Sequence, residues 1–313
     1  MRNGLASVAW LAERLGQPNL RVVDATWFLP NSPFASPVAA RAAHAAARVP
    51  GSTFWDLDEV SDAAAAPSTP HNLPTPAQFA AEARRHGIAP DTRVVCYDQL
   101  GVFSAPRLWH TLRAFGVEAA VLDGGLPAWA AAGHAVERGE PAVEPAAAPA
   151  ADFAYSGELQ WRLGDVEAWL ASDRTVQLVD ARPAGRFRGT APEPRAGCRP
   201  GHAPGARSVP FLDLLDPAPR PAPGPGGPFR GATLKPVDGL RAALHRSSAQ
   251  HGVLVDDGQA RRHAERARAP GEWWSLEQVR AGRMVVQHGP RRKPALDCLQ
   301  AQSQSSSFFF FEC

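Results

Sequence analysis

An internal repeat is the sequence feature that most constrains how this 313-residue chain can fold. The stretch LRVVDATWFLP at residues 20–30 is answered by VQLVDARPAGRF at residues 176–187. Two further pairs follow in the same order, 44–62 with 201–216 and 73–88 with 234–248. A repeat of this kind predicts two similar folding units in tandem. The chain is also longer than one typical hydrophobic core supports.

Each half opens with a short apolar run that ends in an aspartate, Asp24 in the first and Asp180 in the second. Such a run is typical of a buried parallel strand with a polar carboxyl end. The first half continues with a strand predicted at 93–98, a helix at 104–115, a strand at 119–122 and a helix that begins near Gly125. Strands that alternate with helices predict an α/β fold, a parallel sheet with helices on both faces.

Shifts in pattern suggest where the units begin and end. Helical spacing predicts an amphipathic N-terminal helix with its apolar face at Leu5, Val8, Leu11 and Leu15. A stretch rich in Pro and Ala, HAVERGEPAVEPAAAPAADFAYSG, is typical of a linker. We therefore expect a first domain at 1–133, a linker at 134–157, a second and incomplete domain at 158–257, and a poorly ordered tail at 258–313.

Composition excludes several classes of protein. The net charge is +2 and the basic residues are spread along the chain, which favours neither nucleic acid nor a membrane as a partner. The four cysteines show no CxxC spacing, so we expect no disulfide framework, no metal and no cofactor. The N-terminal stretch MRNGLASVAWLAERLG has no cleavable apolar core, and a reducing, cytoplasmic location is expected.

The stretch GRFRGTAPEPRAGCRPGHAPGA at 185–206 holds four arginines, four prolines and five glycines in 22 positions. Proline and glycine shape a loop, and guanidinium groups bind anions. The segment therefore predicts a surface loop that holds an anion.

With FSAPRLWHTLRAFG and LDGGLPAW in the first half and VDARPAGRFRGTAPEPR in the second, the chain resembles the rhodanese family from about residue 5 to about residue 245. Within it, the chain is similar to the branch of 3-mercaptopyruvate and thiosulfate sulfurtransferases. The resemblance implies tandem domains, a small anionic sulfur-containing substrate and a thiol acceptor such as thioredoxin or glutathione, and it admits a mitochondrial location. It further implies that Arg186 and Arg195 hold the carboxylate of mercaptopyruvate. The alternative is that these arginines make surface ion pairs.

The resemblance also implies a nucleophilic cysteine in a strand-to-helix loop, typically CG[ST]GVT, which becomes a persulfide. The repeat places this loop at about 253–266, where the sequence reads VLVDDGQARRHAER. Asp256 stands where the cysteine is expected, and a carboxylate cannot form a persulfide. The corresponding loop of the first half carries Asp98, as expected for a non-catalytic half. No catalytic residue is therefore assigned.

Other cysteines are weaker candidates. Cys198 lies near Arg195, and its alternative role is a small filler in a turn. Cys96 is expected to be buried and inert inside a strand. Cys198 and His202 lack two further ligands for a metal site, and His202 is expected to stabilise its loop through backbone hydrogen bonds. For the two strand-end aspartates we favour capping of loop N–H groups over acid–base chemistry.

Two functions remain open. In the first, the gene encodes a mercaptopyruvate or thiosulfate sulfurtransferase, and this chain is inactive because a reading-frame change, a gene-model error or an alternative exon replaces its catalytic end after about residue 246. In the second, the chain is a non-enzymatic rhodanese-like module that binds anions or regulates a partner.

Overall fold

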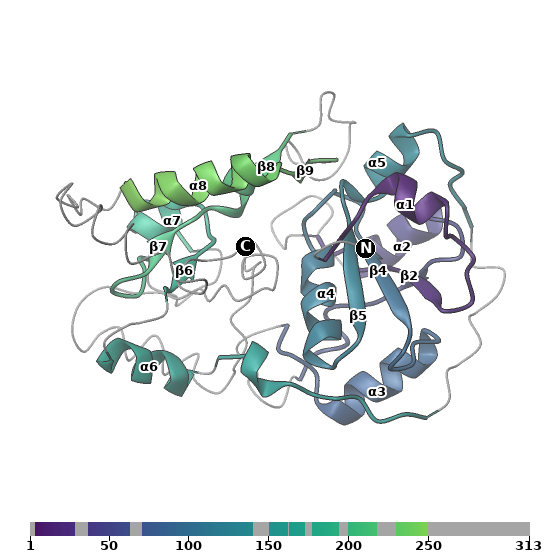
Figure 1. The fold of residues 1–313 in the computed structure, drawn as a ribbon, viewed down its shortest axis with the longest axis horizontal. Helices are drawn as coiled ribbons and strands as arrows, with labels where there is room; N and C mark the ends of the chain where they lie inside the picture. The colour runs from purple at the N-terminus through teal and green to yellow at the C-terminus, as the bar shows by residue number, and fades with distance from the viewer. Residues whose placement is uncertain are drawn as a thin grey trace, which may run out of the picture.

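The computed structural model describes residues 4–28, 37–62, 71–139, 150–161, 163–172, 177–193, 200–217 and 230–249. The first half is built on one parallel sheet with the strand order β1-β5-β4-β2-β3. Figure 1 labels the central strands β5, β4 and β2. Its strands are β1 (Leu5–Ala6), β2 (Leu20–Asp24), β3 (Thr53–Phe54), β4 (Arg93–Tyr97) and β5 (Glu118–Leu122). The α/β fold is confirmed, and the predicted strands agree with β4 and β5 to within a residue at each end.

Helices cover both faces of this sheet, as predicted. The helices among the described residues of this half are α1 (Val8–Ala12), α2 (Pro37–Ala46), α3 (Pro76–Arg85), α4 (Ala105–Ala114) and α5 (Gly125–Ala131). Because successive strand residues point to opposite faces, Val94 and Cys96 pack in the cluster that contains α3 and α4. Val95 and Tyr97 pack in the cluster that contains α1 and α5.

The predicted N-terminal helix is wrong at its start. Leu5 lies in β1, at the edge of the sheet, in register with Val121 of β5. The helix begins only after Ser7, whose hydroxyl accepts a hydrogen bond of 3.2 Å from the backbone N–H of Trp10. An N-cap of this kind ends the extended segment and starts the helix. A two-residue strand is too short to leave a periodicity in the sequence.

The second half has fewer described elements. The predicted strand is present as β6 (Val179–Asp180), which pairs in parallel with β7 (Arg207–Ser208). An antiparallel pair, β8 (Leu215–Asp216) with β9 (Thr233–Leu234), was not predicted. The helices are α6 (Leu163–Ala171), α7 (Ala184–Arg188) and α8 (Val237–Ala249), with short 3-10 turns at Gly157–Leu159 and Phe211–Leu214. The strand and loop expected at 253–266 lie outside the described residues, as does the tail from 258 onward.

The two halves share a hydrophobic core. Phe211, Ala232 and Leu240 of the second half belong to the same buried cluster as Phe103 and the residues under α3 and α4. Next to β9, the backbone N–H of Gly231 donates to the carbonyl of Leu100. A Cβ atom on Gly101 would lie 2.9 Å from the carbonyl oxygen of Ala232, so the two backbones meet without an intervening side chain.

Candidate functional site

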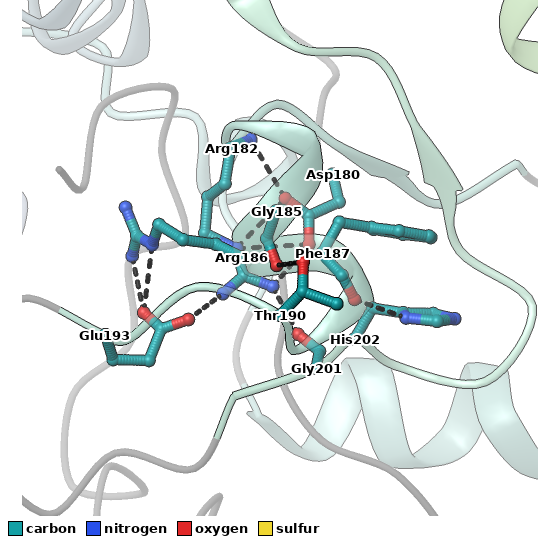
Figure 2. Close-up of polar contacts among 9 residues, drawn as sticks. All are labelled: Asp180, Arg182, Gly185, Arg186, Phe187, Thr190, Glu193, Gly201 and His202. Carbon is teal, nitrogen blue, oxygen red and sulfur yellow. Dashed lines mark hydrogen bonds and ion pairs between the residues drawn. The ribbon is translucent and has the colours of Figure 1, made fainter.

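A buried arginine, Arg182, lies two residues after the end of β6. The guanidinium of Arg182 donates from Nε and Nη2 to the carboxylate of Asp180, at distances of 2.6–3.1 Å. Its Nη2 also donates to the carbonyl of Gly201 at 2.6 Å (Figure 2). Asp180 itself caps the loop, because its Oδ1 accepts a hydrogen bond of 2.9 Å from the backbone N–H of Arg182. The predicted capping role of Asp180 is confirmed.

Glu193 joins this arginine to the one that the sequence singled out. Its Oε1 accepts from Nη1 of Arg182 at 2.7 Å, and its Oε2 accepts from Nη2 and Nε of Arg186 at 2.6 and 3.1 Å (Figure 2). Arg186 lies on α7, and its side chain is only 10% exposed, while that of Glu193 is 3% exposed. Arg186 therefore makes an ion pair, as the alternative interpretation expected, but a buried one rather than a surface one.

The rest of the loop is fixed by short polar and aromatic contacts. The Nδ1 atom of His202 lies 2.8 Å from the carbonyl oxygen of Phe187, and the two rings stack with centroids 3.7 Å apart. This confirms the predicted role of His202 in stabilising the loop. Gly189 adopts φ +73° and ends α7, a conformation that favours glycine.

Only part of the predicted site lies within the described residues. Arg186 is placed as above, whereas Arg195, Cys198 and Asp256 lie outside them. Sequence reasoning missed Glu193, which binds Arg186, and Arg182, which binds Glu193. The signal for Arg182 was its place two residues after a buried strand-end aspartate, where a cation can neutralise the carboxylate.

The first half contains the loop that the internal repeat pairs with residues 253–266. The carboxylate of Asp98, which is fully buried, accepts hydrogen bonds of 2.7–2.9 Å from five backbone N–H groups. The donors are Leu100, Gly101, Phe103, Ser104 and Ala105. Burial raises the pKa of Asp98, and the N–H donors act in the opposite direction. The five backbone N–H groups within residues 100–105 therefore form an anion cradle, and the carboxylate of Asp98 occupies it.

An acid–imidazole pair that the sequence did not reveal lies elsewhere in the first half. The Nε2 atom of His71 lies 2.6 Å from Oδ1 of Asp58, and the indole N–H of Trp27 donates to both oxygens of that carboxylate at 3.2 Å. Burial raises the pKa of Asp58, but the hydrogen bond and the charge of His71 outweigh it, so the pKa is lowered overall.

Cys96 lacks the surroundings that activate a nucleophilic cysteine. It lies in β4 and is fully buried, and desolvation raises the pKa of its thiol well above the ordinary value. A raised pKa lowers the fraction of thiolate, which is the nucleophilic form of cysteine. The expected burial of Cys96 inside a strand is confirmed.

Comparison with known proteins gives the family. Residues 7–132 match the model of the rhodanese-like domain. The 3-mercaptopyruvate sulfurtransferase of Escherichia coli (strain K12) is 39% identical over 210 residues, which cover 66% of this chain and 70% of that enzyme. The human 3-mercaptopyruvate sulfurtransferase is 40% identical over 220 residues, 67% of this chain and 70% of that enzyme. The chain belongs to the rhodanese family.

Other relatives agree with this assignment. The mitochondrial thiosulfate/3-mercaptopyruvate sulfurtransferase 1 of Arabidopsis thaliana is 39% identical over 231 residues, 68% of this chain but only 59% of that protein. Among solved structures, the rhodanese-fold protein SseA from Escherichia coli, described as a 3-mercaptopyruvate sulfotransferase, superposes with a TM-score of 0.63 and 32% identity, covering 81% of this chain and 85% of that one. Among the described helices of this rhodanese-family chain, none has the length and apolar character needed to cross a membrane.

Proposed function

We propose that this chain is a sulfurtransferase-family protein of the 3-mercaptopyruvate and thiosulfate type that keeps the anion-binding loop at Arg186 and Arg195 but transfers no sulfane sulfur. The observation that carries the proposal is the buried Arg182–Glu193–Arg186 arrangement inside the GRFRGTAPEPR motif. Burying two guanidinium groups and two carboxylates in one loop is costly unless all are paired. Such a loop is suited to holding a carboxylate ligand through a guanidinium.

The proposed lack of turnover follows from the chemistry of the transfer. A thiolate must attack the sulfur of mercaptopyruvate, so that an S–S bond forms on the enzyme, the C–S bond breaks and pyruvate leaves after taking up a proton. Asp256 stands at the expected position of that thiolate, and a carboxylate forms no stable bond to sulfane sulfur. Cys96 cannot substitute, because its thiol is buried with a raised pKa.

A sulfur-transfer assay with mercaptopyruvate and a thiol acceptor tests this proposal on three proteins. The chain as it stands should give no product above background. The Asp256→Cys variant should also be inactive, since a thiolate needs a loop whose N–H groups stabilise it. A protein in which the segment after about residue 246 is replaced by a family-type ending should turn over. Activity in the unaltered chain would contradict the proposal, and Cys198→Ser would then be the next variant to measure.

Ligand binding tests the anion loop separately from turnover. Pyruvate carries the same carboxylate and should bind in roughly the millimolar range, as expected for a small ligand with one charged anchor. Arg186→Ala should weaken binding by about 1.5–3 kcal/mol, the scale of charge-assisted hydrogen bonds. The matched control is Arg241→Ala on α8, a residue whose side chain is 62% exposed. Equal binding by wild type and Arg186→Ala would remove Arg186 from the site.

The non-enzymatic module remains the alternative outcome. Reading the genomic DNA across codons 245–313 in all three frames distinguishes the two. A CG[ST]GVT loop in another frame would favour a sulfurtransferase gene with an altered end. Its absence would favour a binding or regulatory module.

A further inference from the structure

Glu193 is a buried acid between two cations, one of which is the proposed ligand-binding arginine. Each of its carboxylate oxygens serves a different guanidinium, Oε1 that of Arg182 and Oε2 that of Arg186. The contact to Arg186 uses two donors on one edge of the guanidinium, Nε and Nη2. Two donors on one acceptor fix the plane of the group as well as its position.

Arg182 links Glu193 to Asp180, the last residue of β6. It holds Asp180 with two of its nitrogens and the carbonyl of Gly201 with one of them. Asp180 ends β6, which is paired with β7. A continuous chain of charged contacts therefore runs from a strand end, through Arg182 and Glu193, to the guanidinium of Arg186 (Figure 2).

We propose that Glu193 is a positioning residue for anion recognition: it orients the guanidinium of Arg186 before the ligand arrives. The inference rests on the proposed anion-binding function. An arginine side chain has several rotatable bonds, and ordering it on binding costs conformational entropy. A guanidinium already ordered by Glu193 avoids that cost, and preorganisation of this kind raises affinity.

Electrostatics alone would predict the opposite effect of removing Glu193. Its negative charge lies within hydrogen-bonding distance of Arg186 and opposes the binding of a second carboxylate there. If charge dominated, Glu193→Gln would bind an anion more tightly. If positioning dominates, the same variant binds more weakly, because the NH2 group of Gln must face one of two guanidinium donors and the bridge is broken. The sign of the change therefore separates the two effects.

The experiment is an NMR titration of the full chain with pyruvate. Glu193→Gln should raise the dissociation constant by about 5- to 10-fold, through loss of preorganisation. The matched control, Glu158→Gln, removes the same charge from an exposed position and should leave the dissociation constant unchanged. Unchanged or tighter binding by Glu193→Gln overturns the inference.

A double-mutant cycle shows whether Glu193 acts through Arg186. In an Arg186→Gln background, Glu193→Gln should change the affinity by less than about 2-fold, because the group that it positions is gone. Full additivity of the two losses would assign Glu193 a merely structural role and overturn the inference. Should Glu193→Gln fail to fold by circular dichroism, Glu193→Asp replaces it. Asp keeps the charge but is too short to reach both arginines, so wild-type affinity in Glu193→Asp would also overturn the inference.

The two proposals fail in different ways. If wild type binds pyruvate and Arg186→Gln weakens binding while Glu193→Gln does not, the anion site stands and the positioning role of Glu193 is wrong. If wild type shows no binding of pyruvate at all, the anion site itself is wrong, and the inference that rests on it falls as well.

Discussion

The carboxylate of Asp123 accepts a hydrogen bond of 2.8 Å from the backbone N–H of Leu234, which joins the end of β5 in the first half to β9 in the second. Asp123→Ala leaves that N–H without its acceptor. We expect the free energy of unfolding to fall by about 1–3 kcal/mol, the cost of a lost partner at a part-buried donor. Urea denaturation measures the change.

The control for Asp123 is the amide of the same shape. Burial raises the pKa of Asp123, because desolvation penalises its charged form. Asp123→Asn keeps an acceptor oxygen and removes the charge, so its stability should match wild type or exceed it. A loss in Asp123→Asn as large as in Asp123→Ala would show that the contact between the halves does not depend on this hydrogen bond.

Alanine substitutions at two glycines with positive φ distinguish the cost of a steric clash from the cost of backbone strain. Gly125 has φ +57°, and a Cβ atom there would overlap the carbonyl oxygen of Asp98 and lie 2.7 Å from that of Gly101. Gly133 has φ +79° with nothing within 4 Å of a Cβ atom. Gly133→Ala should cost about 1–2 kcal/mol from the left-handed conformation alone. Gly125→Ala should cost clearly more, about 4 kcal/mol or above, because backbone must move. Equal losses in urea denaturation would contradict the described approach of α5 to the Asp98 loop.

His110 makes stability depend on pH. Burial, reinforced by Arg107 and Arg113, lowers the pKa of this imidazole to about 3. Between its unfolded pKa of about 6.5 and its folded pKa, the unfolded chain binds the additional proton, so stability is full above pH 6.5 and falls as the pH drops. By pH 4.5 this group alone should remove about 2–3 kcal/mol from the free energy of unfolding. A His110→Gln variant should show a smaller decrease between pH 7.5 and 4.5, and an unchanged slope would assign the dependence to other groups.

The anion cradle of the first half should not tolerate an amide. In Asp98→Asn, the NH2 group faces backbone N–H donors on one side of the cradle, since both carboxylate oxygens accept from such donors. We expect a loss of about 3–5 kcal/mol in the free energy of unfolding, the range for breaking a buried charged network. Asp91→Asn, at an exposed position, provides the control and should be close to neutral. A loss below about 1 kcal/mol for Asp98→Asn would contradict the cradle.

Sequence pattern predicted the fold where one element carries a periodic signal. The apolar runs before Asp24 and Asp180 gave two strands, and the spacing at 104–115 gave α4. Sequence pattern does not predict short strands that pair with distant segments. The strands β1, β8 and β9 are each two residues long, so they form only because of their tertiary contacts.

The sequence predicted which types of residue form the candidate site, but it did not predict which side chains they contact. Asp24 was expected to cap its loop, and its Oδ1 does accept from the backbone N–H of Thr26 at 2.9 Å. Its other oxygen contacts Nδ1 of His44 and Nε2 of Gln99, which come from elements far along the chain. Glu193 was overlooked for the same reason: a glutamate in a loop shows no sign in sequence that two arginines will bury it.

Both described ends of the expected linker are bound to the first half. On one side, the guanidinium of Arg48 holds the carboxylate of Glu137 and the carbonyl of Gly139, each at 2.5 Å. On the other, the ring of Phe153 meets Phe79 edge-on at 4.9 Å, and the backbone N–H of Ser156 donates to a carbonyl at the end of α4. A protease that cut the chain between 140 and 149 would therefore leave 150–156 held in place like a bound peptide. A gene fragment meant to express the first half alone needs to extend to about residue 157. A fragment that stops at 133 lacks Phe153, whose ring packs on the buried Phe79.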